Sequence, residues 1–124
     1  MNRLIAEVYE IDSLDRLNLI KFKLNKQTVN VLILEMNLDL KVGKRAELLI
    51  KPTAISVLNQ KCEFENILSG KLKEVEKGEI LARVLVDIEG FDIESIMIKE
   101  LADFNDEVFV AFKANEVTIS KVFE

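Results

Sequence analysis

The feature that most restricts how this chain can fold is a segment that occurs twice. Residues 48–57 (LLIKPTAISV) and 110–119 (VAFKANEVTI) share a pattern in which an alternating apolar strand ends at a lysine and a short turn leads into a second alternating run. Lys51 and Lys113 lie 62 positions apart, as do Ile55 and Val117. Recurrence at a fixed offset near half the chain length indicates a tandem duplication. We therefore predict two repeats, residues 1–60 and 61–124.

Each repeat has the pattern of five short strands. In the first repeat, alternation and intervening turns predict strands over residues 4–11, 17–24, 28–34, 45–50 and 54–58, with space for one helical turn after the third strand. The predicted inward faces carry Ile20, Phe22 and Leu24 on the second strand, and Val29, Val31 and Ile33 on the third. This order is typical of a small OB-like barrel. Each copy has a thin core, so we expect one all-β unit of two five-stranded barrels, packed together or exchanging strands.

The second repeat follows the same order with small shifts in the offset. Leu68, Gly70 and Leu72 align with Leu4, Ala6 and Val8 at an offset of 64. Matching residues 82–86 to residues 20–24 requires an offset of 62, which predicts that the first hairpin is two residues longer in the first repeat. Residues 98–105 correspond to the short helical segment.

Composition and charge exclude several classes of function. The chain is 49% hydrophobic and 31% charged, has no tryptophan, and carries a net charge of −5. An acidic chain with few aromatic residues is a poor nucleic-acid binder. No apolar run approaches the roughly 20 residues of a membrane helix, and charges follow Met1 too soon for a signal peptide. Cys62 has no partner for an intrachain disulfide, so we expect a cytoplasmic protein.

The residue types also argue against an enzyme. The sequence has no histidine, no glycine-rich phosphate loop and no nucleophile elbow, and its carboxylates lack the spacing of a metal site. No histidine is present to activate Cys62, which lies in a polar linker. We therefore expect a binding protein with no catalytic residues, no metal site and no organic cofactor.

Three motifs of the second repeat carry a family resemblance. Residues 66–70 read NILSG, the strand over residues 82–86 follows a glycine turn at Gly78, and residues 113–119 read KANEVTI. These resemble the opening Asn-x-Leu-x-Gly pattern, the strand after a glycine turn and the closing Lys-Ala-x-x-Val-x-Ile motif of the Mop/TOBE family of small molybdate- and tungstate-binding domains. Residues 51–57 are similar to the generic TOBE version of the closing motif, and the resemblance covers nearly the whole chain. It implies a tandem protein with one TOBE/Mop-like and one Mop-like repeat.

The resemblance implies an intracellular oxyanion-binding function: storage, homeostasis or sensing of molybdate or tungstate, with a molybdate transporter component as a candidate partner. Such anions are tetrahedral and need converging N–H groups, hydroxyls and cations. The candidate ligands are Lys113, the N–H of Ala114, Lys51, Ser95 and Asn66. Each also has an ordinary structural interpretation. The lysines can be solvated turn residues, Ser95 can bond a neighbouring carbonyl inside the core, and Asn66 can hold a turn.

The alternative is a structural or protein-interaction module that kept the fold and lost the ligand. It is motivated by Glu65, which occupies the position of an arginine in the family, and by Ile98 and Leu101, which occupy polar positions. A glutamate repels a dianion where an arginine would attract it.

We also expect a homo-oligomer, either a dimer or a trimer, because the first half carries a charge of +2 and the second half −7. Apolar residues opposite the barrel cores should supply the adhesion, and the interface should bury Phe109. These residues are Leu81, Leu85, Ile96 and Phe109.

Overall fold

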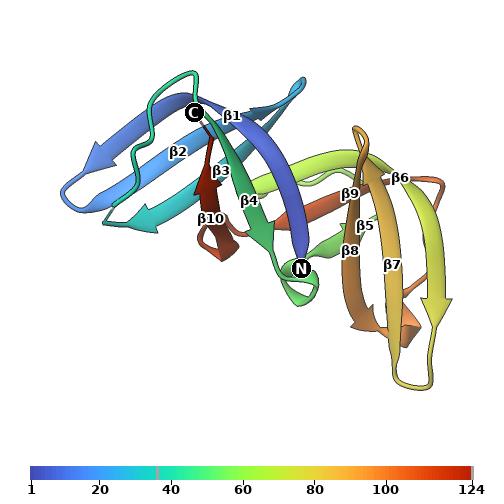
Figure 1. Cartoon of the computed structure of the whole chain (residues 1–124). Helices are drawn as coiled ribbons and strands as arrows, with labels where there is room; N and C mark the ends of the chain where they lie inside the picture. The colour runs from blue at the N-terminus through green and yellow to red at the C-terminus, as the bar shows by residue number, and fades with distance from the viewer. Residues whose placement is uncertain (36, 124) are drawn as a thin grey trace.

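In the computed structural model, which describes residues 1–35 and 37–123, the chain forms two curled five-stranded sheets (Figure 1). The first repeat supplies β1 (Asn2–Leu14), β2 (Leu17–Leu24), β3 (Gln27–Leu34), β4 (Arg45–Ile50) and β5 (Ser56–Leu58). The second supplies β6 (Asn66–Lys77), β7 (Leu81–Ile88), β8 (Phe91–Ile98), β9 (Glu107–Phe112) and β10 (Val117–Val122). The predicted all-β fold class is confirmed.

The helical elements are short 3₁₀ turns. In the described part of the chain they are η1 (Pro52–Ala54), η2 (Lys99–Leu101) and η3 (Ala114–Glu116). η2 lies after the third strand of the second repeat, where a turn was expected, whereas residues 37–44 of the first repeat form no helical turn. The turns η1 and η3, which follow Lys51 and Lys113 and let the chain change direction between two strands, were not expected, so the second repeat has two turns where at most one was predicted.

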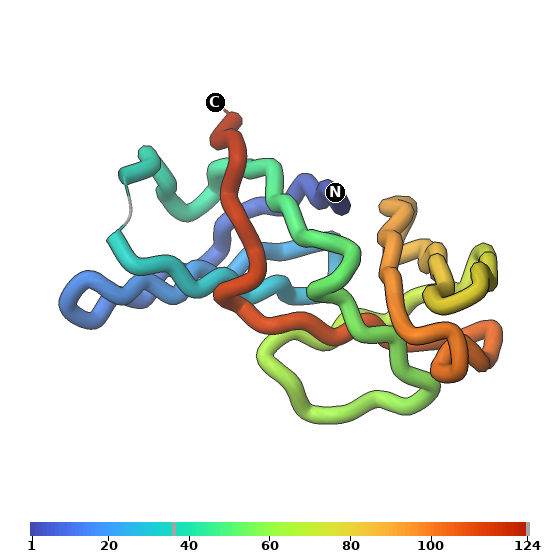
Figure 2. The backbone as a smooth tube through the Cα atoms, turned by 90° about the horizontal axis from the view of Figure 1, so that it is seen from below, coloured from blue at the N-terminus to red at the C-terminus, as the bar shows by residue number. Residues whose placement is uncertain are grey.

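The two sheets exchange their last strands. The first has the order β10-β4-β1-β2-β3 and the second β5-β9-β6-β7-β8, so each takes one edge strand from the other repeat. Figure 2 shows the red C-terminal segment leaving the second sheet to complete the first. Val117 pairs with Ile50 on β4, and Ser56 pairs with Ala111 on β9. The repeats at residues 1–60 and 61–124 therefore do not coincide with the two sheets.

The strand register corrects one expectation about the offset between repeats. Val8 pairs with Phe22 in the first repeat, and Leu72 pairs with Val86 in the second, so the offset is 64 through the first hairpin. The first hairpins are equal in length, and the two extra residues of the first repeat lie in the connection between its third and fourth strands. A two-residue shift keeps every side chain on the same face, so the apolar pattern cannot detect it.

The core lies inside the two curled sheets. Ile20, Phe22 and Leu24 are fully buried, as are Val29 and Val31, and these predicted inward faces are confirmed. Ile33 is only partly buried near the end of its strand.

The residues expected on the opposite faces are more accessible. Leu81 is 52% exposed, while Leu85, Ile96 and Phe109 are half-buried in the single chain. Burial of Phe109 between subunits stays a prediction.

Candidate functional site

Two equivalent turns mark the points where the chain passes from one sheet to the other. Lys51 and Lys113 each precede a 3₁₀ turn with extended backbone, and both are exposed. The carbonyl of Lys51 accepts a hydrogen bond from the N–H of Ala54, and that of Lys113 accepts one from Glu116. Each turn packs against the third strand of the opposite sheet, η1 against β8 and η3 against β3. Both predicted cations therefore lie at the junction of the sheets.

The turn after Lys113 is held by its neighbours in the first and second repeats. The N–H of Ala114 donates a hydrogen bond to the Glu65 carboxylate, Oε1, at 2.8 Å. The amide of Asn66, which is 1% exposed, accepts from the backbone N–H of Asn30 at 2.6 Å and donates to its carbonyl at 2.8 Å. The Asn30 side chain donates to the carbonyl of Glu65 at 2.8 Å. Lys113, Ala114 and Asn66 thus share one neighbourhood, in which Glu65 supplies a negative oxygen.

The turn after Lys51 differs in its hydrogen bonds. Pro52 follows the lysine and has no N–H to offer an anion. Ser95 is fully buried, and its hydroxyl donates to the carbonyl of Ile55 at 2.6 Å, which ties β8 to the end of the turn. Ser95 therefore takes the structural role of a buried serine bonded to a carbonyl, and that bond uses its hydroxyl proton.

A second asparagine, which sequence reasoning missed, mirrors Asn66. The side chain of Asn2 donates to the carbonyl of Glu94 at 2.8 Å and accepts from its N–H at 2.7 Å. Asn2 is 4% exposed and lies 64 positions before Asn66, just as Asn30 lies 64 positions before Glu94. The offset of the duplication was the signal that could have identified Asn2. The two asparagines act as matched clamps between the sheets.

The structure therefore divides the predicted site residues into two groups. Lys113, Ala114 and Asn66 lie together at one junction, while Lys51 and Ser95 lie at the other, where Ile55 links them along the chain. The side-chain amide of Asn66 uses both its oxygen and its nitrogen in hydrogen bonds to the backbone of β3. Lys113 is exposed, whereas the N–H of Ala114 is bonded to the Glu65 carboxylate.

A shallow pocket of about 210 Å³ lies beside Lys113. Ser56 and Phe64 line it together with Lys113 and Glu116, so its charged groups are one ammonium and one carboxylate. A tetrahedral dianion here would meet a single nearby cation. It could reach the Ala114 N–H only if the Glu65 carboxylate moved away, because the two oxygens would compete for one donor.

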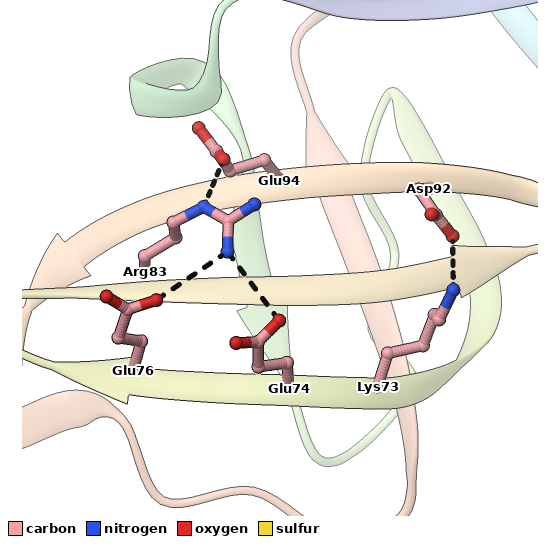
Figure 3. A network of polar contacts seen from close by, with 6 residues as sticks. All are labelled: Lys73, Glu74, Glu76, Arg83, Asp92 and Glu94. Atoms are coloured by element: carbon pink, nitrogen blue, oxygen red, sulfur yellow. Dashed lines mark hydrogen bonds and ion pairs between the residues drawn. The ribbon is translucent and has the colours of Figure 1, made fainter.

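The outer face of the second sheet carries an ion-pair network that is separate from these turns (Figure 3). The Nε of Arg83 on β7 donates a hydrogen bond to Glu94, and its Nη1 lies 3.7 Å from a carboxylate oxygen of Glu74. The hydrogen bond that Arg83 donates to Glu94, together with the surrounding carboxylates, raises the pKa of Arg83 above its usual value. Lys73 donates to Asp92 at 3.0 Å, which raises the pKa of Lys73.

The two cations of this network have no charged counterpart in the first repeat, where Tyr9 and Leu19 replace Lys73 and Arg83. Thr28 replaces Asp92, and its hydroxyl lies 3.4 Å from that of Tyr9. Glu74 and Glu76 correspond to Glu10 and Asp12, so these two positions stay acidic. Within the network, two cations on two strands contact four carboxylates, and no converging donors are left for a ligand. It is a feature of the solvated surface of the second repeat.

Among the residues that the structure describes, no group of three or more His, Cys, Asp or Glu side chains could hold a metal ion. In the same part of the chain, no helix is long and apolar enough to cross a membrane.

Comparison with known proteins supports the fold. No protein-family model and no curated protein matches the sequence. Among solved structures, the chain resembles the cytoplasmic molybdate-binding protein ModG, crystallised with molybdate bound, with a TM-score of 0.87 and 19% identity. The match covers 96% of this chain and 94% of that one. At this identity the likeness shows a common architecture, and the chain therefore has the fold of the molybdate-binding protein ModG over nearly its whole length.

Proposed function

We propose that the chain binds molybdate or tungstate at the turn after Lys113, as an intracellular storage, homeostasis or sensing protein. The observation that carries this proposal is the fold likeness to molybdate-bound ModG, which extends over 96% of the chain. The site itself offers a supporting detail. The N–H of Ala114 already binds an anionic oxygen, that of Glu65. Lys113 supplies the positive charge, and Asn66, which follows Glu65, ties the start of β6 to β3.

The turn after Lys51 is the weaker of two sites in this proposal. Pro52 removes the N–H that Ala114 provides in the second repeat, so Lys51 contributes charge without the adjacent donor. Ser95 acts here by fixing Ile55 and not as a ligand. The proposed function requires no catalytic residue and no organic cofactor. We expect the protein in the cytoplasm, with a molybdate transporter component as a candidate partner.

A second candidate function is favoured by Glu65. Its carboxylate accepts the hydrogen bond of the Ala114 N–H, which an oxyanion would otherwise accept, and it does so from within the chain. A protein that satisfies this turn internally can keep the fold without a ligand. It would then serve as a structural or protein-interaction module.

Isothermal titration with molybdate and with tungstate, using sulfate as the control anion, tests the proposal. Saturable heat with molybdate or tungstate is expected. Lys113→Ala should weaken that binding by about 1.5–3 kcal/mol, the usual value of a hydrogen bond to a charged group. Lys61→Ala removes the same charge from the exposed linker and should leave the affinity unchanged. The absence of heat with any of the anions would favour the interaction module.

A further inference from the structure

Two pockets occupy equivalent positions in the two repeats. One, of about 330 Å³, lies on the first sheet and reaches Phe91 at the start of β8. The other, of about 460 Å³, lies on the second sheet and reaches Gln27 at the start of β3. Phe91 and Gln27 are themselves 64 positions apart, so each pocket combines one sheet with the third strand of the other. The duplication has therefore produced two similar faces beside the junction of the sheets.

The charges on these two faces are reversed position by position. On the first sheet, Glu7 pairs across the strands with Lys23 on one side and Arg45 on the other. We call these three residues the basic triad. Its central glutamate is flanked by two cations.

On the second sheet, Lys71 pairs with Asp87 and with Glu107 in the same arrangement. We call these three residues the acidic triad. A central lysine is flanked by two anions, so every sign is opposite to its counterpart in the basic triad. Glu89, which also lines this pocket, makes the second face still more acidic.

These charges are available to a partner. In the described part of the chain, none of the six triad residues belongs to an ion pair, whereas eight ion-pair contacts form elsewhere. Asp87 accepts a hydrogen bond from the N–H of Gly90, and the ammonium of Lys23 lies 4.9 Å from the ring centre of Tyr9. Neither contact neutralises the charge of its triad.

Each triad also borders apolar surface. Phe109 lines the pocket of the acidic triad, and Ile5 and Phe91 line that of the basic triad. All three are half-buried in the single chain. Exposed ion pairs add little affinity but discriminate strongly between partners, so the apolar residues would supply the adhesion and the triads the specificity.

We propose that the basic triad of one chain docks on the acidic triad of a second copy of the same chain. When the two triads face each other, each cation lies opposite an anion. Each triad has one central charge between two of the opposite sign, so the charges also match when one triad is turned end to end. Two basic triads would instead place like charges opposite each other. The contact is therefore heterologous: a two-fold dimer would make it twice, and a cyclic trimer three times.

Charge-reversal variants test the proposal with the full chain. The variant Glu7→Lys, Lys23→Glu, Arg45→Glu carries two acidic triads, and the variant Lys71→Glu, Asp87→Lys, Glu107→Lys carries two basic triads. Each alone should run as a 14.2 kDa monomer by light scattering at micromolar concentration, while the natural chain runs as an oligomer. An equimolar mixture of the two should assemble again, and high salt should weaken that assembly.

The controls separate docking from folding and from net charge. Lys61→Glu and Glu63→Lys give the same net-charge changes in the exposed linker and should leave the oligomer intact. Far-UV circular dichroism checks the fold. If a triple variant fails to fold, the single exchanges Arg45→Glu and Glu107→Arg replace it, since both sites are exposed. A monomeric natural chain, variants that assemble alone, or folded variants that do not assemble when mixed would each overturn the proposal.

Discussion

Replacing Glu65 by glutamine removes the negative charge at the Ala114 N–H and keeps an oxygen that can accept its hydrogen bond. In the natural chain this bond, at 2.8 Å, is assisted by the charge of the carboxylate. Such bonds contribute about 1.5–3 kcal/mol, and neutral ones about 0.5–1.5 kcal/mol. Glu65→Gln should therefore weaken the internal competitor by about 1 kcal/mol, and less repulsion of a dianion acts in the same direction.

A change of about 1 kcal/mol corresponds to roughly fivefold tighter binding. Titration calorimetry with molybdate on the natural chain and on Glu65→Gln measures it directly. Glu63→Gln removes one negative charge from the same exposed linker and controls for the general field of the protein. If Glu65→Gln binds molybdate no more tightly than Glu63→Gln does, Glu65 does not compete for the anion site.

Two further predictions concern stability. Asn66→Ala removes both hydrogen bonds of a clamp and leaves the backbone of Asn30 without these partners. Urea unfolding should show that the free energy of unfolding falls by about 2–3 kcal/mol. An unchanged midpoint would contradict the clamp role. Gly70→Ala would place a Cβ 2.6 Å from the carbonyl oxygen of Asp87, so thermal unfolding should show a loss of about 1–3 kcal/mol. Ala6 holds the equivalent position in the first repeat, so Ala6→Gly is the matched control and should cost about 1 kcal/mol or less.

Much of the fold could be predicted from the sequence because the strands alternate clearly. The bounds expected for β2, over residues 17–24, and for β4, over residues 45–50, agree with the structure. From the sequence, an exchange of strands between the repeats was one of two alternatives, and the other was that two complete barrels pack against each other. The edge strands β5 and β10 would have the same alternating pattern in either sheet, so the pattern does not predict which strand each one pairs with.

The site was harder to predict because it depends on contacts between the repeats. The pattern correctly placed Ser95 inside the core, but its bond to Ile55 joins residues 40 positions apart. Glu65 was recognised as an acidic residue at an arginine position, yet its bond to Ala114 spans 49 positions. Single-sequence periodicity carries information on which face a residue occupies and none on which distant donor it meets.

The exchanged strands predict that the two sheets unfold together. Removal of β10 from the first sheet would leave an edge of β4 unpaired, and loss of β5 would do the same to β9, so neither sheet is complete while the other is unfolded. For 124 residues, one cooperative unit should have an unfolding enthalpy of about 85 kcal/mol near 60 °C. Differential scanning calorimetry of the natural chain should give a van't Hoff enthalpy at least equal to the calorimetric one. Two transitions, each with a van't Hoff enthalpy of about 40–45 kcal/mol, would instead mean that the sheets unfold independently despite the exchange.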